Sequence, residues 1–338
     1  MSAQIESSTN NKSAPKHLLK GGAKLFVVIL LFILAMMIVL GLIPVTIKEL
    51  VSSPDPAGDY EEALRRFKRI LEREKGILMS EAAGSQLRTH GQKTDRVYVL
   101  VHGYTNSPRQ FMEIGELLYE RGHNVLIVRL PHHGLKSHDV GELKNVQPED
   151  LSAYSDEVLD IAAGLGEQVH VVGFSVGGAV ASWIAQNRPD IERVMILSPM
   201  FGLDHLPSYV DDFFMNLGSR CPNINFIGPE EPHREHVYRG MSSRGVAEAM
   251  IFGKSVFKQA YRISPAVSNI IVGTNGNDTT VNNRRTYELA KMWEQSGANI
   301  VLYEYPESLG LPHNMIDISE ADTDIAIVNA KILELLGE

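Results

Sequence analysis

Residues 169–178, Val169-His170-Val171-Val172-Gly173-Phe174-Ser175-Val176-Gly177-Gly178, decide the fold of this chain. The apolar run Val169–Phe174 predicts a buried strand, and Val176–Asn187 predicts a helix directly after it. Glycines around Ser175 permit a turn too tight for larger side chains, and such a turn lifts the serine clear of the sheet. In this setting the Val176 amide points to where an oxyanion would form. An idle serine in a glycine-rich turn is the less favoured alternative.

Outward from this turn, short apolar runs alternate with helical patterns. This alternation predicts an α/β fold with a mostly parallel sheet and helices on both faces, over residues 92–338. Residues 200–265 break the rhythm, since no strand is expected there and prolines interrupt the segment, so we expect an inserted cap. The other expected strands are Val97–Val101, Asn124–Leu130, Val194–Leu197, Ile270–Val272 and Ile300–Tyr305, and the other expected helices are Gln110–Arg121, Pro148–Gly164, Asn282–Gln295 and Ser319–Leu336.

A serine hydroxyl is a weak nucleophile unless a base takes its proton and an acid orients that base. After a serine in such a turn, the acid is expected to follow a later strand and the histidine to come near the end. Asp278 ends the turn Asn275-Gly276-Asn277-Asp278 after one strand, and His313 follows the last strand. We therefore predict Ser175 as nucleophile, His313 as base and Asp278 as acid. Asp204 is the fallback acid.

The loop after the first strong strand, Val101-His102-Gly103-Tyr104, is expected to supply a second oxyanion donor. Gly103 lets the backbone approach the site, and the Tyr104 amide is the predicted donor beside that of Val176. His102 is interpreted as a structural residue that orients the loop. His132 and His133, which follow the next strand, are interpreted as loop residues and not as metal ligands.

The sequence predicts no cofactor and no metal site. It contains no phosphate-binding loop of the G-x-x-x-x-G-K type, no G-x-G-x-x-G and no C-x-x-C, and Cys221 is the single cysteine. His233 and His236 lie among Glu230, Glu231 and Glu235, but without helical H-E-x-x-H spacing a solvated loop is the favoured interpretation. A formal charge of −9 argues against nucleic-acid binding.

Charge is unevenly distributed around an apolar segment near the N-terminus. Residues 1–48 carry five lysines and one glutamate, a net of +4, and the remaining residues carry −13. Between Lys24 and Lys48 no residue is charged, and the 19 residues Leu25–Ile43 contain no polar side chain. As a helix those residues would extend about 28 Å, close to the thickness of the bilayer core. We therefore predict a basic tail over 1–24 and a transmembrane signal-anchor over 25–47.

Flanking charge predicts the orientation of this segment. Four lysines precede it, at positions 12, 16, 20 and 24, whereas Lys48 is followed by acidic residues. The positive-inside rule then places the N-terminus in the cytoplasm and the catalytic part outside, in a periplasmic or extracellular location. Residues 48–91 are expected to hold a linker and an amphipathic helix, Asp59–Lys75, that packs on the following domain rather than lying on the bilayer.

Over residues 92–338 the chain resembles the α/β-hydrolase superfamily, within it the bacterial carboxylesterase and monoacylglycerol-lipase-like group. The resemblance implies the same roles for Ser175, Asp278 and His313, an oxyanion amide at Tyr104, and a lid formed by the insertion. One departure concerns the shape of a loop, because His132 stands where these proteins usually have the first glycine of P-G-H-G. The motifs that carry the resemblance are Val101-His102-Gly103-Tyr104, Arg129-Leu130-Pro131-His132-His133-Gly134, Gly173-Phe174-Ser175-Val176-Gly177-Gly178, Asp278-Thr279-Thr280-Val281 and Leu311-Pro312-His313.

The sequence thus predicts a membrane-anchored serine hydrolase that cleaves a carboxyl ester of a small molecule or lipid. An amidase or peptidase with the same triad is one alternative, and a non-catalytic binding module is another. The fold alone fixes neither substrate nor oligomeric state. Nine apolar residues of the cap suit either an acyl chain or packing on the core. They are Phe201, Leu206, Tyr209, Val210, Phe213, Phe214, Met250, Phe252 and Phe257.

Overall fold

The structure is a computed structural model that describes residues 16–228, 235–320 and 323–338. Within these residues, seven strands form one sheet in the order β1-β3-β2-β4-β5-β8-β9. Only β1 runs antiparallel to its neighbour, and the other pairs are parallel, which confirms the predicted mostly parallel sheet. The strands are β1 (Gln86–Arg88), β2 (Thr94–Val101), β3 (Asn124–Ile127), β4 (Gly166–Phe174), β5 (Arg193–Leu197), β8 (Asn269–Asn275) and β9 (Asn299–Tyr305).

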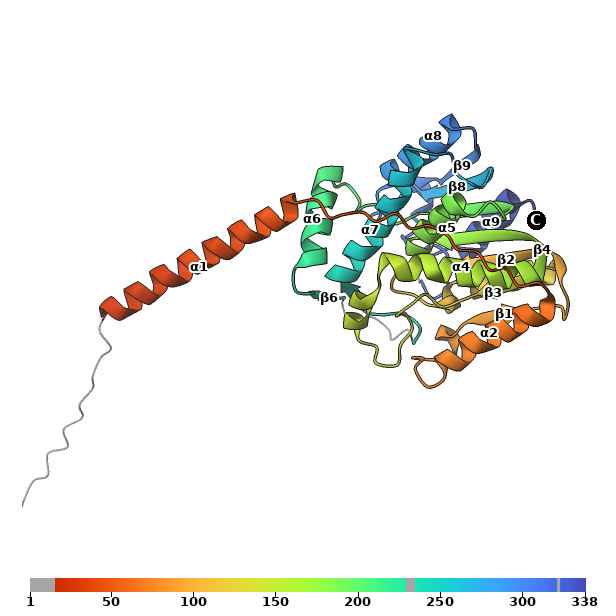
Figure 1. The fold of residues 1–338 in the computed structure, drawn as a ribbon, viewed down its shortest axis with the longest axis horizontal. Helices are drawn as coiled ribbons and strands as arrows, with labels where there is room; N and C mark the ends of the chain where they lie inside the picture. Colours follow the sequence, from red (N-terminus) through yellow and green to blue (C-terminus); the bar gives the residue numbers. More distant parts are fainter. Residues whose placement is uncertain (1–15, 229–234, 321–322) are drawn as a thin grey trace, which may run out of the picture.

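Helices cover both faces of this sheet (Figure 1). Side chains alternate along a strand, so Val97, Val99 and Val101 of β2 join one apolar cluster and Tyr98 and Leu100 join the other. The first cluster includes residues of α2 (Tyr60–Glu74), α4 (Pro148–Leu165), α5 (Val176–Asn187) and α8 (Asn283–Gln295), and the second includes residues of α3 (Met112–Glu120) and α9 (Ile325–Leu336).

Two predicted elements are shorter in the structure than expected. The strand expected over Asn124–Leu130 ends at Ile127 because the next backbone groups bond to side chains, with Arg129 N donating to Ser85 Oγ. The helix expected over Ser319–Leu336 begins at Ile325, where Asp324 accepts a hydrogen bond from the Ile327 amide as the N-cap. Strand β1 was not predicted, since three residues carry too short a pattern.

The inserted cap contains two helices, α6 (Ser208–Arg220) and α7 (Ser243–Ala260), and a small β-hairpin. The prediction that residues 200–265 contain no strand is wrong, because β6 (Asn225–Ile227) pairs antiparallel with β7 (Gly240–Ser242). Each strand has three residues, and Gly240 adopts a φ of 135°, so neither shows the alternation by which a strand is recognised.

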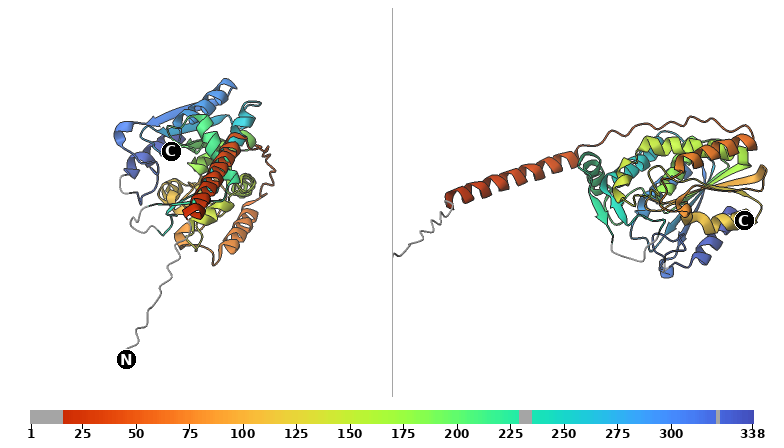
Figure 2. Two further views of the ribbon diagram at one scale, coloured as in Figure 1. Left: turned by 90° about the vertical axis from the view of Figure 1, so that its left-hand side faces the viewer. Right: turned by 90° about the horizontal axis from the view of Figure 1, so that it is seen from below.

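The apolar N-terminal segment forms α1 (Lys16–Leu42), which projects away from the domain (Figures 1 and 2). Among the described residues it is the one helix whose length and composition suffice to cross a membrane, over Lys24–Leu42. The helix ends before the expected boundary at Ile47, because Pro44 has no amide hydrogen and disfavours helical geometry in the residue before it.

The amphipathic helix predicted over Asp59–Lys75 is present as α2. Asp59 is its N-cap and accepts a hydrogen bond from the Glu62 amide. Its apolar residues Ala63, Phe67 and Ile70 are buried in the same cluster as residues of α4, so the helix packs on the domain as expected. The charged side chains on its outer face pair locally, as in the Arg66–Glu62 ion pair at 2.6 Å.

Backbone packing is very tight where α5 crosses β2. A Cβ atom added to Gly177 would lie 2.0 Å from the Val101 carbonyl oxygen, and one added to Gly173 would lie 2.0 Å from the Gly177 carbonyl oxygen. Because these neighbours are backbone atoms of central elements, they cannot move without separating the helix from the sheet.

Gly177→Ala is expected to lower the free energy of unfolding by about 3 kcal/mol, because the added methyl overpacks this crossing. Denaturant unfolding of the detergent-solubilised chain measures it. Gly58→Ala is the control, since the nearest atom there is a Glu62 carboxylate oxygen at 3.6 Å, an ordinary van der Waals contact. Equal stability of the two variants would contradict this view of the packing.

Candidate active site

Ser175 occupies the tight turn between β4 and α5 that the sequence predicts, and its backbone is strained there. Its φ is 56° and its ψ is −115°, a backbone geometry that residues other than glycine rarely adopt. Hydrogen bonds on both sides hold it there: its amide donates to the Leu197 carbonyl, and its carbonyl accepts from the amides of Ala179 and Met200, each at 3.0 Å. The turn is therefore imposed by the strand and helix beside it.

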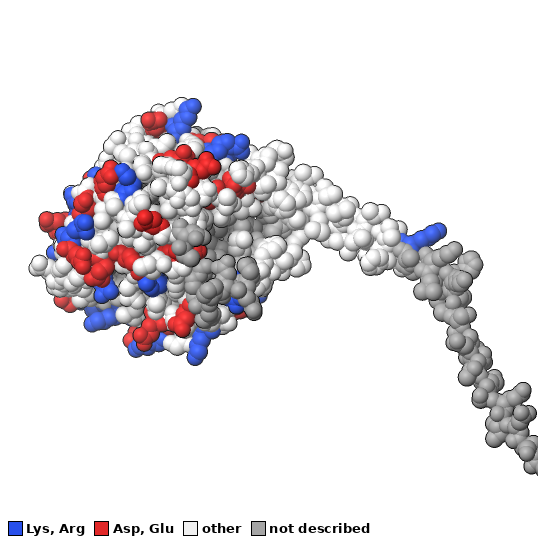
Figure 3. All heavy atoms as spheres, turned by 180° about the vertical axis from the view of Figure 1, so that it is seen from behind, with Lys and Arg blue, Asp and Glu red and all other residues white. Residues whose placement is uncertain are grey.

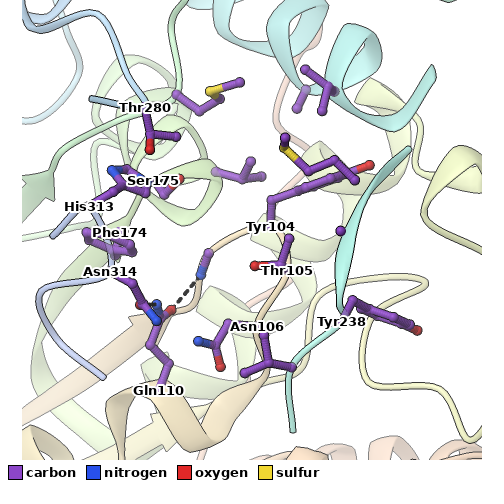
Figure 4. Close-up of a pocket in the computed structure, with 18 of the residues that line it drawn as sticks. Tyr104, Thr105, Asn106, Gln110, Phe174, Ser175, Tyr238, Thr280, His313 and Asn314 are labelled. Carbon is purple, nitrogen blue, oxygen red and sulfur yellow. Dashed lines mark hydrogen bonds between the residues drawn. The ribbon is translucent and has the colours of Figure 1, made fainter. Parts of the chain in front are cut away.

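The structure brings Ser175, His313 and Asp278 together, although they lie far apart in the sequence. Figure 4 shows Ser175 and His313 side by side, and His313 Nε2 is 3.0 Å from Ser175 Oγ. On the other side of the ring, His313 Nδ1 is 2.7 Å from Asp278 Oδ2. Both distances lie within the range of hydrogen bonds. A hydroxyl, an imidazole and a carboxylate are thus bonded in the order that general-base activation of a serine requires.

Asp278 is held as a buried carboxylate. Its second oxygen, Oδ1, accepts hydrogen bonds from the amides of Thr280 and Val281 at 2.9 and 3.1 Å. Burial acts to raise the pKa of this carboxyl, but these donors and His313 outweigh it, so the pKa lies below its ordinary value. The fallback acid, Asp204, lies elsewhere and pairs with His205 at 2.8 Å.

The loop that carries His313 is fastened to the turn that carries Asp278. Asn275 Nδ2 donates to the carbonyls of Leu311 and Pro312 at 2.9 and 3.1 Å, and Asn277 Nδ2 donates to that of Leu311 at 3.0 Å. These bonds fix the spacing between the imidazole and the carboxylate. Asn275 and Asn277 were predicted only as turn residues, and the structure gives both a positioning role.

A cavity of about 380 Å³ lies over Ser175 and His313, between the ends of the strands and the cap. None of the nine apolar cap residues proposed from the sequence is among the residues that line it. Phe201, Met250, Phe252 and Phe257 are instead buried in the core, as the packing alternative proposed. The apolar side chains that do line it are Phe174, Val176, Met200, Val237, Met241, Val246 and Ala249, together with the rings of Tyr104 and Tyr238.

The loop expected to hold the second oxyanion donor borders this cavity, and both Tyr104 and Val176 line it. The Gly103 amide donates to Gln110 Oε1 at 2.7 Å (Figure 4). His102 is fully buried: its Nε2 accepts from the Leu130 amide at 3.0 Å, so its Nδ1 carries the hydrogen donated to the Gly103 carbonyl. Burial holds the pKa of this imidazole well below its usual range, and His102 is a neutral brace for the loop.

A second polar group that the sequence did not reveal connects the loops around the cavity. Asp317 is 1% exposed, and its Oδ2 accepts a hydrogen bond from Asn106 at 2.7 Å and lies 3.3 Å from His236 Nε2. Gln110 continues the network by donating to Asn314 Oδ1 at 2.5 Å. Asp317 thus links the loop after β2, the His313 loop and the cap. No local pattern marks residues that meet across such separations.

The unusual His132 adopts a φ of 63°, in the left-handed region that favours glycine. His132 therefore adopts a backbone conformation that glycine reaches without strain. His133 is buried, and its Nδ1 lies 2.7 Å from the Pro131 carbonyl oxygen. Burial lowers the pKa of this imidazole to about 4, consistent with a neutral loop residue.

Among the described residues, no group of three or more His, Cys, Asp or Glu side chains could hold a metal ion. Glu230, Glu231 and His233 of the weak ligand cluster lie outside the described residues. His236, which is described, faces Asp317.

Comparison with known proteins agrees with this architecture. Residues 98–299 match the model of the Alpha/beta hydrolase family, and the chain belongs to that family. The predicted resemblance is therefore confirmed at the level of the family. It does not by itself select among the reactions that this fold supports.

Curated relatives are lipases and related hydrolases. A thermostable monoacylglycerol lipase from Bacillus sp. (strain H-257) is 26% identical over 149 residues, which cover 39% of this chain and 55% of the lipase. Lysophospholipase L2 from Escherichia coli (strain K12) is 25% identical over 149 residues, 41% of this chain and 43% of that protein. The chain thus spans about half the length of the relatives it matches.

Solved structures share the fold at low sequence identity. One, reported with the metagenome-derived lipolytic enzymes LipS and LipT, has a TM-score of 0.58 at 15% identity, covering 78% of this chain and 100% of that chain. The monoacylglycerol lipase of Paleococcus ferrophilus has a TM-score of 0.55 at 17% identity, covering 75% of this chain and 98% of that chain.

Asp317→Asn is expected to lower the free energy of unfolding by about 2 kcal/mol at pH 7, because an amide nitrogen then faces buried donors. Burial acts to raise the pKa of Asp317, but hydrogen bonds from His236, Asn106 and Ser319 outweigh it and the pKa is strongly depressed. A carboxyl whose pKa is lower in the folded state stabilises the fold at pH values above its unfolded pKa, which is about 3.9. That stabilisation is lost as the pH falls toward the pKa of the folded state.

The deficit of Asp317→Asn should therefore be constant between pH 7 and pH 5 and should shrink below about pH 4. Denaturant unfolding at several pH values measures it. Asp95→Asn is the control, because Asp95 is exposed and the change in net charge is the same. A deficit that grows on acidification would show that Asp317 is not held as a carboxylate.

Proposed function

We propose that this chain is a serine hydrolase that cleaves carboxyl esters through an acyl-enzyme. The observation that carries the proposal is the continuous pair of hydrogen bonds from Ser175 through His313 to Asp278. The strained serine turn and the partly apolar cavity over it support the same conclusion. Relatives described as a monoacylglycerol lipase and a lysophospholipase favour an ester, and a lipid ester in particular.

In the first half-reaction, Ser175 Oγ attacks the ester carbonyl carbon while His313 Nε2 takes the hydroxyl proton. The amides of Tyr104 and Val176 donate to the oxygen that becomes negatively charged. The carbon–oxygen bond to the alcohol then breaks, and His313 returns its proton to the leaving alkoxide. Asp278 keeps the imidazole in the required tautomer and stabilises its positive charge.

In the second half-reaction, His313 deprotonates a water molecule that attacks the acyl carbon. Collapse of this intermediate breaks the bond to Ser175 Oγ, which recovers its proton from His313, and the free acid leaves. Metals and cofactors take no part in the proposed sequence. His102 is assigned no step, because both of its ring nitrogens are engaged in bracing the loop.

We also propose that α1 anchors the enzyme in a membrane as an uncleaved signal-anchor. The span Lys24–Leu42 has the length and composition required, and lysines precede it. The positive-inside rule then places the N-terminus in the cytoplasm and the catalytic domain outside. In this arrangement residues 1–24 are the cytoplasmic tail, residues 48–91 connect the anchor to the domain, and residues 92–338 form the hydrolase domain with its cap over 200–265.

A fluorophosphonate probe should label Ser175, because the activated hydroxyl attacks phosphorus as it attacks a carbonyl carbon. Ser175→Ala should abolish labelling and lower kcat for p-nitrophenyl esters by about 10⁶-fold. Mass mapping of the labelled peptide and a chromogenic assay measure both. Ser80→Ala is the control, because the Ser80 hydroxyl has no hydrogen-bond partner to lose.

Labelling at another residue, or full turnover by Ser175→Ala, would overturn the assignment. A folded chain that takes up no probe would favour the non-catalytic binding module. Parallel assays with matched esters and anilides separate the remaining alternative, since an amidase or peptidase would turn over the anilide at a comparable rate.

Substitution of the two candidate acids, Asp278 and Asp204, is expected to have different effects on kcat. Asp278→Asn should lower kcat by about 10⁴-fold, because an amide cannot hold the imidazole in the required tautomer. Asp204→Asn is the matched control and should leave kcat unchanged, because Asp204 pairs with His205. Steady-state kinetics with a soluble ester measures both. The reverse result would make Asp204 the acid.

A further inference from the structure

The end of the apolar helix α1 is bonded to the cap helix α6. Asn216 Nδ2 donates to the Gly41 carbonyl at 2.9 Å, and Asn216 Oδ1 accepts from the Val45 amide at 3.0 Å. Arg220 donates to three further carbonyls in the same segment. The last carbonyls of a helix have no partner within it, so two side chains of α6 supply what the helix end lacks. The acceptors of Arg220 are the carbonyls of Leu40, Ile43 and Pro44, at 2.9, 2.5 and 3.0 Å.

Side-chain packing reinforces this joint. A Cβ atom at Gly41 would lie 2.3 Å from the Phe213 ring, so the ring of α6 lies directly against the backbone of α1. Only glycine permits that approach. The joint between α1 and α6 is therefore shaped for one relative position of the two helices.

The segment that follows α1 extends the attachment along the domain. Lys258 of α7 donates to the Ile47 carbonyl at 2.6 Å. The Leu50 carbonyl accepts from Trp183 Nε1 and Gln259 Nε2 at 3.1 and 3.2 Å. Residues 43–58 thus run along the surface of the domain and are hydrogen-bonded to it, so they are not a flexible linker (Figure 2). Once α1 is fixed in a bilayer, the orientation of the cap relative to that bilayer is fixed as well.

The β6–β7 hairpin lies at the end of the domain from which α1 projects (Figures 1 and 2). We call Ile224, Phe226, Ile227 and Met241 the hairpin patch. These side chains are 58, 56, 68 and 41% exposed. Figure 3 shows mostly uncharged atoms where the domain meets α1 and charged side chains over the opposite end. An exposed apolar cluster of this kind marks a surface that contacts an apolar partner.

The hairpin patch adjoins the catalytic cavity. Met241 belongs to both, and Gly228 and Gly240 next to the patch also line the cavity. An acyl chain that passes along the hairpin patch therefore reaches the wall of the cavity directly.

We propose that the hairpin patch rests in the surface of the bilayer that α1 spans, and that lipid esters enter the cavity from that bilayer past the hairpin. The inference rests on the membrane anchor and ester hydrolysis proposed above, and it adds the source of the substrate. The bilayer is the occupant because α1, whose end is fastened to α6, brings the patch to its surface. Aromatic and aliphatic side chains at such a depth bind by apolar burial.

Depth-dependent quenching tests this placement without requiring catalysis. The full chain carrying Phe226→Trp is reconstituted in phosphatidylcholine vesicles with brominated acyl chains. Tyr261→Trp is the matched control, because Tyr261 is 75% exposed and follows the far end of α7. Bromine should quench the indole added at position 226 and spare the one added at position 261. The two native tryptophans are buried and contribute equally to both variants.

Each outcome decides a different point. Alkaline extraction first establishes whether the chain stays in the membrane pellet. If it does, equal quenching of the two added indoles, or quenching of neither, overturns the proposal. Release of the chain by that extraction overturns the anchor and this inference together. Absence of ester hydrolysis overturns the proposed activity and the entry route for lipid esters, but it leaves the position of the hairpin patch standing, because quenching reports position only.

The joint and the entry route are tested by two further variants. Gly41→Leu should weaken the quenching of the position-226 indole because the Phe213 ring must move, whereas Ala35→Leu adds the same side chain on an exposed face of α1 and should not. Ile227→Asp should raise KM for vesicle-borne lipid esters about tenfold and leave kcat/KM for a soluble short-chain ester unchanged. Equal losses on both substrates would contradict entry from the bilayer.

Discussion

The contact between Gly177 and the Val101 carbonyl is the constraint on which the site depends. It lets α5 begin immediately against the end of β2, and Ser175 must then occupy the strained turn before the helix. The same contact places the end of β2, and the loop that follows it, beside the serine. Backbone packing therefore positions Ser175, the proposed nucleophile, together with the amides expected to donate to the oxyanion. Groups held in this way need no reorganisation during the proposed reaction.

Side-chain hydrogen bonds position the loops that backbone packing does not hold. Asn275 and Asn277 fasten the His313 loop to the Asp278 turn, and Asp317 connects that loop to the one that follows β2 and to the cap. Both networks lie among buried groups whose donors and acceptors are matched, and satisfied buried networks specify one arrangement of the loops. Hydrogen bonds between the loops thus hold the side chains of the proposed triad in fixed relative positions.

The sequence was most informative where chemistry demands a local pattern. The turn at Ser175 carries its own signature, and the strand that precedes each of Asp278 and His313 could be recognised by its apolar run. The contacts of Asp317 and Gln110 could not be predicted, because they join side chains from separate loops that only the folded sheet brings together. The β6–β7 hairpin was missed because three-residue strands show no periodicity. None of the nine cap residues proposed for an acyl pocket lines the cavity, and four of them are buried in the core. The helix α1 was recognised from composition, but its attachment to α6 depends on Asn216 and Arg220, which carry no signal of that role.

Together these features describe a hydrolase whose proposed reaction centre is positioned by the sheet and whose cap is bonded to the apolar helix α1. The central claim is that Ser175 carries the acyl group between two half-reactions. The most direct test is mass spectrometry of the chain quenched at early times of turnover with an ester that deacylates slowly. We predict one acyl group per chain, located on the peptide that contains Ser175 and lost at the rate of turnover. Turnover with no adduct on that peptide, or an adduct on another residue, would contradict the account.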